Sequence, residues 1–371
     1  MKRLLLILFF TISVTLLNAQ TAQNYFDNGL KNIEAEEYEK ALVNFSNSIK
    51  ANPTNKEAYN QRGFVKNMLG DFYGAIGDYN FAIDLDSTYA DAYNNRGIAK
   101  YNLGDDVYAV LDFNKAIEVN PELADAFTNR GLAYYNMEEL EAAFFDFSKS
   151  IDLDPNNADI YFNRAVVRVE LEEYLGAIDD YNKSLALDSS DPDVYNYRGV
   201  AKYNIGDLEG SLADYNKSIE MDSEDALKYD NRALVKSALG QFKEALVDYD
   251  KSISLFPDDP DSYNLRGVVK YSLENHEDAI ADYSSAIELD PENSIYYDNR
   301  GLSKVAMEDY PGAIEDFSIS IELFPNDGDI YLQRGLAKIK MGDNYDGCLD
   351  LKVAKDFGIT EAGKEIKKNC K

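Results

Sequence analysis

Side chains able to carry out catalytic or metal chemistry are scarce in this chain of 371 residues. It has a single histidine, His276, and two cysteines, Cys348 and Cys370. One histidine is too few for a histidine metal triad, no Ser-His-Asp set or Cys-His pair is evident around it, and the sequence has no glycine-rich phosphate loop. Carboxylates are plentiful, but none differs from its many equivalents. We therefore predict a protein that is not an enzyme and that uses no cofactor and no metal; a hydrolase with an unrecognised carboxylate site is the alternative.

The charge of the chain narrows the class of partner. Lysine and arginine number 37 against 67 aspartates and glutamates, which gives a net charge of -30, and no basic block interrupts the acidic background. A phosphate backbone or an anionic membrane surface would meet like charge almost everywhere. We expect protein or peptide partners, no nucleic acid, and no insertion of the mature chain into a membrane.

Side-chain amides recur at a fixed spacing. An arginine followed by Gly or Ala returns every 34 residues from Arg62 to Arg334, which divides residues 22–361 into ten units of 34 positions. Position 6 of these units carries Asn95, Asn129, Asn163, Asn231 and Asn299, with Gln61 and Gln333 as longer amides. Because an amide both donates and accepts, such a column can hold an extended peptide by its backbone. Tyr197 and Leu265 interrupt the column. The alternative is that each Asn bonds within its own repeat.

Acids and tyrosines accompany the amides. Position 2, one helical turn before position 6, carries Asp91, Asp125, Asp159, Asp193, Asp261 and Asp329. Position 12 carries Tyr101, Tyr135, Tyr203 and Tyr271. A surface of acids, amides and tyrosines favours a basic or neutral extended segment. The alternative is an ordinary solvated helix start, where acids are stabilised by the helix dipole.

The elements that must position these residues are helices. Positions 4, 8 and 11, and then positions 20, 24, 27 and 28, each follow the three-or-four spacing of one helix face. A Gly-Asp or acidic pair at positions 15 and 16 separates the two helices, and proline at position 32 ends the second. Small residues at positions 8 and 20 let the two helix backbones approach closely, and the aromatics at positions 4 and 24 fill the space beside them. Each unit is a helical hairpin that must stack on its neighbours to bury its apolar face.

This pattern resembles the tetratricopeptide repeat, over about 340 residues, with an aromatic at 4, small residues at 8, 20 and 27, an aromatic at 24 and proline at 32. The resemblance implies an all-α fold, a right-handed superhelical solenoid of ten antiparallel helix pairs whose first helices line a concave groove, and a role in protein interaction. The five asparagines of position 6 are similar to the asparagine ladder of O-linked N-acetylglucosamine transferases. Arginine at 7 and Lys or Arg at 11 depart from the repeat consensus.

These basic residues predict ion pairs. Arginine at 7 and the basic residue at 11 share one helix face, and position 23 of the second helix is aspartate in nine units, from Asp78 to Asp350. We expect a ladder of Arg-Asp pairs along the stack that sets its register and does no chemistry. His276, at position 17 where other units carry an aromatic, is interpreted as a packing substitution.

The first residues have the three parts of an export signal. Lys2 and Arg3 precede an apolar run of about 14 residues, too short to span a membrane, and Ala19 offers a small residue for cleavage. We expect residues 1–19 to be a signal peptide and the mature protein to be periplasmic or secreted from a bacterial cell.

The last residues are predicted to form a cap. Residues 360–371 read as a capping helix with Thr360 as N-cap, which would cover the final apolar face of the solenoid. Cys348 and Cys370 lie at similar distances on either side of the turn at Gly358, so in an exported protein we expect a disulfide between them, two free thiols being the alternative.

Together these features predict an exported interaction module that binds extended peptide segments in a concave groove. The alternative within the same class is a structural scaffold of an envelope complex that uses its outer faces.

Overall fold

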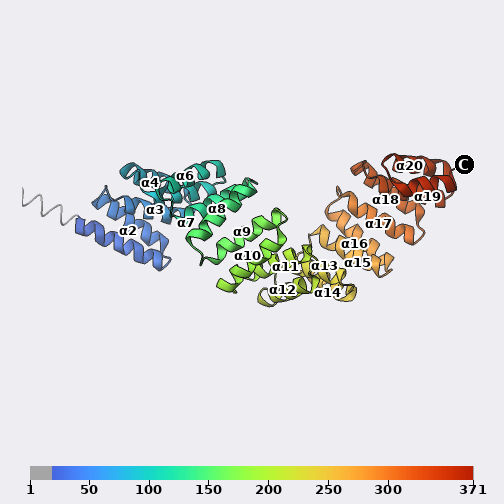
Figure 1. The fold of residues 1–371 in the computed structure, drawn as a ribbon, viewed down its shortest axis with the longest axis horizontal. Coiled ribbons are helices and arrows are strands. Elements are labelled where there is room, and N and C mark those ends of the chain that lie inside the picture. The colour runs from blue at the N-terminus through green and yellow to red at the C-terminus, as the bar shows by residue number, and fades with distance from the viewer. Residues whose placement is uncertain (1–18, 371) are drawn as a thin grey trace, which may run out of the picture. The chain divides into compact units, whose positions relative to one another are not determined.

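The computed structural model describes residues 19–370, and every described element is helical. The predicted signal peptide, apart from residue 19, lies outside this range. The described chain divides into two compact units, residues 19–190 and 191–370, each holding five of the ten 34-residue repeats (Figure 1). The predicted all-α class is confirmed.

In the first unit, a helix over residues 19–34 begins the first repeat. The remaining first helices are α3 (Lys56–Met68), α5 (Ala90–Asn102), α7 (Ala124–Asn136) and α9 (Ala158–Glu170). The second helices are α2 (Tyr38–Ala51), α4 (Phe72–Leu85), α6 (Asp106–Val119), α8 (Leu140–Leu153) and α10 (Tyr174–Leu187).

The second unit repeats this order. Its first helices are α11 (Pro192–Asn204), α13 (Ala226–Ala238), α15 (Pro260–Ser272), α17 (Ser294–Ala306) and α19 (Gly328–Lys340). Its second helices are α12 (Leu208–Met221), α14 (Phe242–Leu255), α16 (His276–Leu289), α18 (Tyr310–Leu323) and α20 (Asn344–Asp356), and α21 (Thr360–Asn369) follows.

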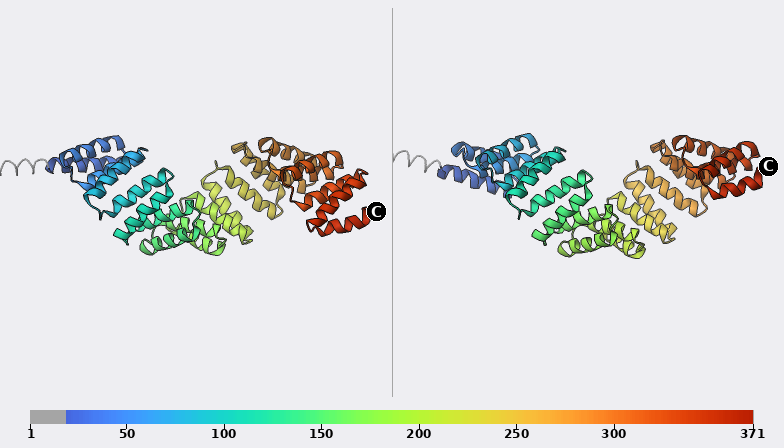
Figure 2. Two further views of the ribbon diagram at one scale, coloured as in Figure 1. Left: turned by 90° about the horizontal axis from the view of Figure 1, so that it is seen from above. Right: turned by 45° about the horizontal axis from the view of Figure 1, so that its top comes forward.

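Short polar residues begin the helices, and left-handed residues separate them. Position 34 supplies the N-cap of most first helices; Asn55, for example, accepts a hydrogen bond from the backbone N–H of Ala58 at 3.1 Å. At position 15 the backbone is left-handed, with φ of 80° at Gly70 and 61° at Glu138. This turn reverses the chain within three residues and makes each repeat an antiparallel hairpin (Figure 2).

The core of each repeat is an aromatic ring pressed on a helix backbone. The ring at position 24 is fully buried, as at Phe113, and a Cβ added to Gly97 at position 8 would lie 2.5 Å from it. Only glycine or a small residue fits there without displacing the ring. The small residue at position 8 therefore makes room for the ring at position 24, whereas the sequence predicted that it lets the two helix backbones approach closely. Alanine at position 20, such as Ala109, is likewise fully buried.

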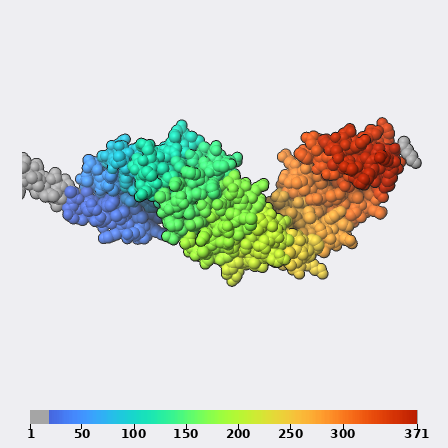
Figure 3. Space-filling model, viewed as in Figure 1, coloured from blue at the N-terminus to red at the C-terminus, as the bar shows by residue number. Residues whose placement is uncertain are grey.

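Neighbouring hairpins stack in chain order within each unit. Each second helix contacts the first helix of the next repeat, and successive first helices, such as α5 and α7, also contact one another. Figure 3 shows the repeats of each unit packed closely in sequence order. The first helices of a unit therefore present one continuous surface.

The chain ends with a disulfide-linked cap. Ala362 on α21 is fully buried against Leu351 and Ala354 of α20, and Ile366 packs on the same cluster. Cys348 and Cys370 form a disulfide with their Cα atoms 5.8 Å apart. The predicted capping helix and bridge are both present. The prediction of Thr360 as N-cap was wrong by one residue, because Ile359 occupies that place and no side chain caps the helix.

Candidate functional site

The amides of position 6 are tied to the preceding repeat. The side-chain nitrogen of Asn95 donates a hydrogen bond of 3.1 Å to Oδ1 of Asn60, and Asn129 donates one of 3.1 Å to Asn94. In the second unit, Asn231 donates to Asn196 at 3.2 Å and Asn299 to Asn264 at 2.8 Å. Each acceptor is a buried asparagine at position 5. The amides therefore bond between repeats, and not within a repeat as the alternative interpretation supposed.

The partner at position 5 explains part of the interruption of the amide column. Wherever position 5 is asparagine, position 6 of the following repeat is asparagine as well. Two repeats carry aspartate at position 5 instead. Asp230 is followed by Leu265 at position 6 of the next repeat, and Asp298 is followed by Gln333. The sequence therefore contains a pairing of asparagines 35 residues apart, which position 6 alone does not show.

Three amides of the column have no such partner. Asn163, Gln61 and Gln333 are half-buried, and none of them makes a side-chain hydrogen bond within the described residues. Asn163 follows Thr128 at the preceding position 5, whose hydroxyl lies 2.7 Å from that of Ser150. The side-chain amide of Asn163 therefore keeps both its donor and its acceptor for a ligand.

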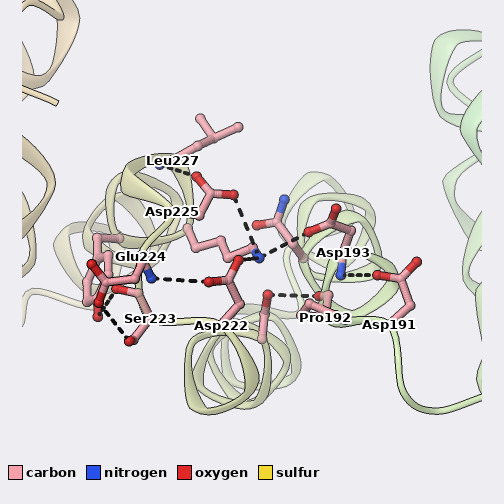
Figure 4. A network of polar contacts seen from close by, with 12 residues as sticks. Asp191, Pro192, Asp193, Asp222, Ser223, Glu224, Asp225 and Leu227 are labelled. Carbon is pink, nitrogen blue, oxygen red and sulfur yellow. Dashed lines mark hydrogen bonds and ion pairs between the residues drawn. The ribbon is translucent and has the colours of Figure 1, made fainter. Parts of the chain in front are cut away.

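Two acids of position 2 are already engaged. The ammonium of Lys228, whose side chain is 1% exposed, lies 3.0 Å from Asp193, 2.7 Å from Asp222 and 3.7 Å from Asp225. Figure 4 shows these carboxylates converging on one nitrogen. Burial alone would lower the pKa of Lys228, but its hydrogen bonds to Asp222 and Asp193 outweigh burial and raise it. Asp261 accepts a hydrogen bond of 2.6 Å from Tyr296.

The other aspartates of position 2 stand at helix starts. Asp91, Asp125, Asp159 and Asp329 are exposed. Half-buried aliphatic residues occupy position 9, one turn beyond the amides, as at Ile98, Leu132 and Val166. The full set of exposed acid, asparagine and aliphatic residue occurs in three successive repeats, on α5, α7 and α9. We call these nine residues the acid-amide face: Asp91, Asn95, Ile98, Asp125, Asn129, Leu132, Asp159, Asn163 and Val166.

The predicted arginine ladder is confirmed. In all nine repeats with arginine at position 7, Nε and Nη2 bind the two oxygens of the aspartate at position 23, as in Arg96 and Asp112 at 2.9 and 2.6 Å. Asp112 is 4% exposed, and Lys100 at position 11 adds a second cation 2.7 Å from it. The arginine also lies over the aromatic at position 4, with Arg96 5.4 Å from the ring centre of Tyr93.

A third hydrogen bond carries the ladder between repeats. Nη1 of the arginine donates to position 25 of the preceding repeat, for example from Arg96 to Oδ1 of Asn80 at 2.6 Å. Equivalent bonds join Arg62 to Ser46, Arg130 to Asn114, Arg164 to Ser148, Arg232 to Asn216, Arg266 to Asp250, Arg300 to Ser284 and Arg334 to Ser318. Because its donors are occupied in this way, the arginine helps to hold successive repeats together. Sequence reasoning found the aspartate partner but missed position 25.

Two half-buried aspartates at position 5 have raised pKa values. Asp230 accepts hydrogen bonds of 2.7 Å from both Ser252 and Ser262, but its Oδ1 is buried without a partner among the described residues. Burial raises the pKa of Asp230 to about 6, against the effect of the serine hydroxyls. Burial likewise raises the pKa of Asp298 to about 6. They occupy the place where other repeats bury a neutral asparagine.

No group of three or more His, Cys, Asp or Glu side chains within residues 19–370 is arranged to hold a metal ion. His276 packs at 5.0 Å from the ring of Tyr271, which agrees with its interpretation as a packing substitution. In the described part of the chain, no helix combines the length and the apolar character needed to cross a membrane. The acid-amide face is therefore the strongest candidate site, and hydrogen bonding and charge are the chemistry it offers.

Comparison with known proteins agrees with the fold. The tetratricopeptide repeat family matches residues 124–157, 260–293 and 229–259, and its TPR repeat variant matches 67–104 and 167–206. Comparison with curated proteins gives no match.

Solved structures with the same fold include the Cut9-Hcn1 hetero-tetramer of the APC/C, with 15% identity and a TM-score of 0.53 over 96% of this chain and 85% of that chain. PilF of Pseudomonas aeruginosa has 18% identity and a TM-score of 0.50 over 54% of this chain and 92% of its own. YrrB, described as a TPR protein with an unusual peptide-binding site, has 25% identity and a TM-score of 0.44 over 50% of this chain and 95% of its own. The repeat pattern, the paired helices and the family matches agree: the chain is a tetratricopeptide-repeat protein and belongs to a family of non-enzymatic protein-interaction scaffolds.

Proposed function

We propose that this tetratricopeptide-repeat protein is exported and binds an extended, basic segment of a partner protein along the acid-amide face of α5, α7 and α9. The observation that carries the proposal is the bond from each of Asn95 and Asn129 to an asparagine of the preceding repeat. It uses the side-chain nitrogen and leaves the carbonyl oxygen as the acceptor for a ligand. Two of the three amides are therefore held in place before a ligand binds.

The chemistry of the face selects its ligand. Fixed amide oxygens accept hydrogen bonds from backbone N–H groups, which only an extended segment presents in a row because a helix uses its own. The exposed carboxylates of Asp91, Asp125 and Asp159 favour lysine or arginine side chains on that segment. The aliphatic residues at position 9 offer contacts to small apolar side chains. An acidic ligand would be repelled by the carboxylates, and a helical ligand would offer the amide oxygens no free backbone N–H groups.

Export is supported by the sequence features of residues 1–19. The net charge of -30 fits a protein whose partner is basic and whose surface resists aggregation outside the cell. Fractionation of a bacterial host that produces the full chain, with mass determination of the mature N-terminus, tests this part separately. Full-length protein in the cytoplasm would contradict export and leave the binding proposal untouched.

A crosslinking experiment tests the binding site. Mature protein and a variant with Asn95→Ala, Asn129→Ala and Asn163→Ala are each incubated with envelope extract and crosslinked, after circular dichroism has shown both to be folded. We expect a partner that wild type retains and the variant loses. A partner retained equally by both would move the interaction off the acid-amide face. Gln333→Ala in the second unit is the matched control.

A further inference from the structure

Large apolar side chains lie exposed on the second helices of the first unit. They occupy positions 18 and 22, which are one helical turn apart and so share one side of the helix. We call these six residues the outer apolar row: Val43, Tyr73, Val107, Leu111, Phe145 and Leu175. Their exposed fractions run from 57% at Leu111 to 78% at Tyr73. They come from α2, α4, α6, α8 and α10, and none lies on the first helices that form the acid-amide face.

The repeat architecture does not require this row. In the second unit the same positions hold Glu209, Ala213, Lys243, Val247, Glu277, Ala281, Pro311 and Glu315 before the last repeat. Among these only Val247 is a large exposed apolar residue. Both units stack their helices through the same buried positions. Exposed apolar side chains in consecutive repeats of one unit therefore indicate a surface for binding, because water-exposed apolar patches otherwise favour aggregation.

An acidic edge borders the row. The turn that precedes each second helix of the first unit carries carboxylates at positions 15 to 18. They are Glu36, Glu37, Glu39, Asp71, Asp105, Asp106, Glu138, Glu139, Glu141, Glu172 and Glu173. Lys40 is a neighbouring cation. Apolar side chains beside a line of carboxylates fit a ligand with an apolar side and a basic flank.

Three glutamates of the acidic edge adopt an unfavourable left-handed backbone conformation. Glu36, Glu138 and Glu172 have φ of 56°, 61° and 59°, where Gly70 and Gly104 adopt the same left-handed turn without strain. The left-handed conformation is unfavourable for a residue that carries a Cβ. The second unit has the same strain at Glu274 and Glu308, but positions 18 and 22 of those two repeats carry no large apolar side chain. Only the first unit combines the acids with the apolar row.

We propose that the outer apolar row binds an amphipathic helix of a partner protein, with its apolar side over Val107, Leu111 and Phe145 and its lysines or arginines along the acidic edge. The second helices satisfy their own backbone groups and offer none to an extended strand, so the occupant must satisfy its own as well. A second copy of the chain would bring the same carboxylates together, and an anionic membrane would also be repelled by them. This surface and the acid-amide face are independent.

Two synthetic helices probe the surface. Both are fluorescein-labelled, about 18 residues long, with leucine at i, i+3, i+4 and i+7. One carries lysine on the flanks of the apolar side and the other carries glutamate. Fluorescence anisotropy with the mature chain should show the lysine helix binding about tenfold more tightly than the glutamate helix, with the difference shrinking at high salt.

Four variants locate the site. Val107→Ser, Leu111→Ser and Phe145→Ser combined should weaken the lysine helix about tenfold, whereas Val247→Ser, at an equally exposed position of the second unit, should not. Glu138→Gln, Glu139→Gln and Glu141→Gln combined should remove the preference for lysine. Asn163→Ala on the acid-amide face should leave the lysine helix unaffected. Since the substituted apolar and acidic side chains are exposed and Asn163 makes no side-chain hydrogen bond within the described residues, folding should persist, and circular dichroism checks it.

Other outcomes overturn the proposal. Equal binding by wild type and the triple serine variant would place the helix elsewhere. If analytical ultracentrifugation shows that wild type forms a dimer and the triple serine variant does not, the outer apolar row binds a second copy of the chain. Binding of wild type, but not of the serine variant, to vesicles of phosphatidylglycerol and phosphatidylcholine would assign it to a lipid surface.

Discussion

The side chain of Asn129 donates a hydrogen bond of 3.1 Å to Oδ1 of Asn94, a buried residue one repeat earlier. The pair joins α7 to α5 and at the same time fixes an amide that we propose contacts the ligand. Asn94→Ala should therefore lower the free energy of unfolding by about 1–3 kcal/mol, because it leaves a half-buried amide without its acceptor. Urea unfolding of the full chain measures this. A double-mutant cycle with Asn129→Ala should give a coupling of about 1 kcal/mol, and additive effects would show that the bond contributes nothing.

The buried aspartate of the arginine ladder should be far more costly to remove than a surface acid. Asp112→Ala leaves Arg96 and Lys100 without their shared counter-ion, and we expect a loss of about 3–5 kcal/mol in the free energy of unfolding. Glu118→Ala, which removes an exposed pair 2.7 Å from Lys115 on the same helix, should cost about 0.5 kcal/mol or less. Equal losses in the two variants would contradict a structural role for the ladder.

The second unit should lose stability as the pH rises through about 6. The folded pKa of Asp230 is raised to about 6 from a usual value of 3.8, so its contribution is fully present below the unfolded pKa and disappears as the pH passes the folded pKa. Asp230→Asn should increase the free energy of unfolding at pH 7 by about 1–2 kcal/mol, with allowance for solvent screening, and should have little effect at pH 4.

The reverse substitution is the control for this prediction. Asn264 occupies the equivalent buried position one repeat later, where it accepts from Asn299. Asn264→Asp should destabilise the second unit at pH 7 more than at pH 4. If thermal unfolding of the Asp230→Asn variant follows pH as wild type does, the raised pKa of Asp230 is wrong.

The terminal disulfide should stabilise the cap locally. It joins residues with a sequence separation of 22, and such a loop contributes about 3 kcal/mol. Cys370→Ser, or reduction of wild type, should raise amide hydrogen exchange in α21 and in the part of α20 that contacts it. Exchange in the first unit should not change, because repeat arrays pass instability mainly to near neighbours. Unaltered protection of α21 after reduction would show that apolar packing alone holds the cap.

Much of the fold was predictable from the spacing of a few residue types. The ring at position 24, the glycine at position 8 and the Arg-Asp pair are local consequences of one helical hairpin, so a single repeat contains their signal. The bond from Asn95 to Asn60 was not predicted, because it joins different positions of different repeats. Lys228 was also missed, since its three carboxylates all belong to the preceding repeat, Asp193 in α11 and Asp222 and Asp225 between α12 and α13. Features that depend on the contact between repeats leave only pairwise signals in a sequence.

The affinity of the acid-amide face for an extended peptide is the decisive measurement. The probe is a labelled peptide of about ten residues that alternates lysine with alanine and serine, titrated into mature protein by fluorescence anisotropy. Asn163→Ala removes an amide that has no structural bond, so it should weaken binding without loss of stability. The triple variant Asn95→Ala, Asn129→Ala and Asn163→Ala should weaken binding by about tenfold or more, and Gln333→Ala should not. Equal affinity of wild type and the triple variant would contradict the proposed site.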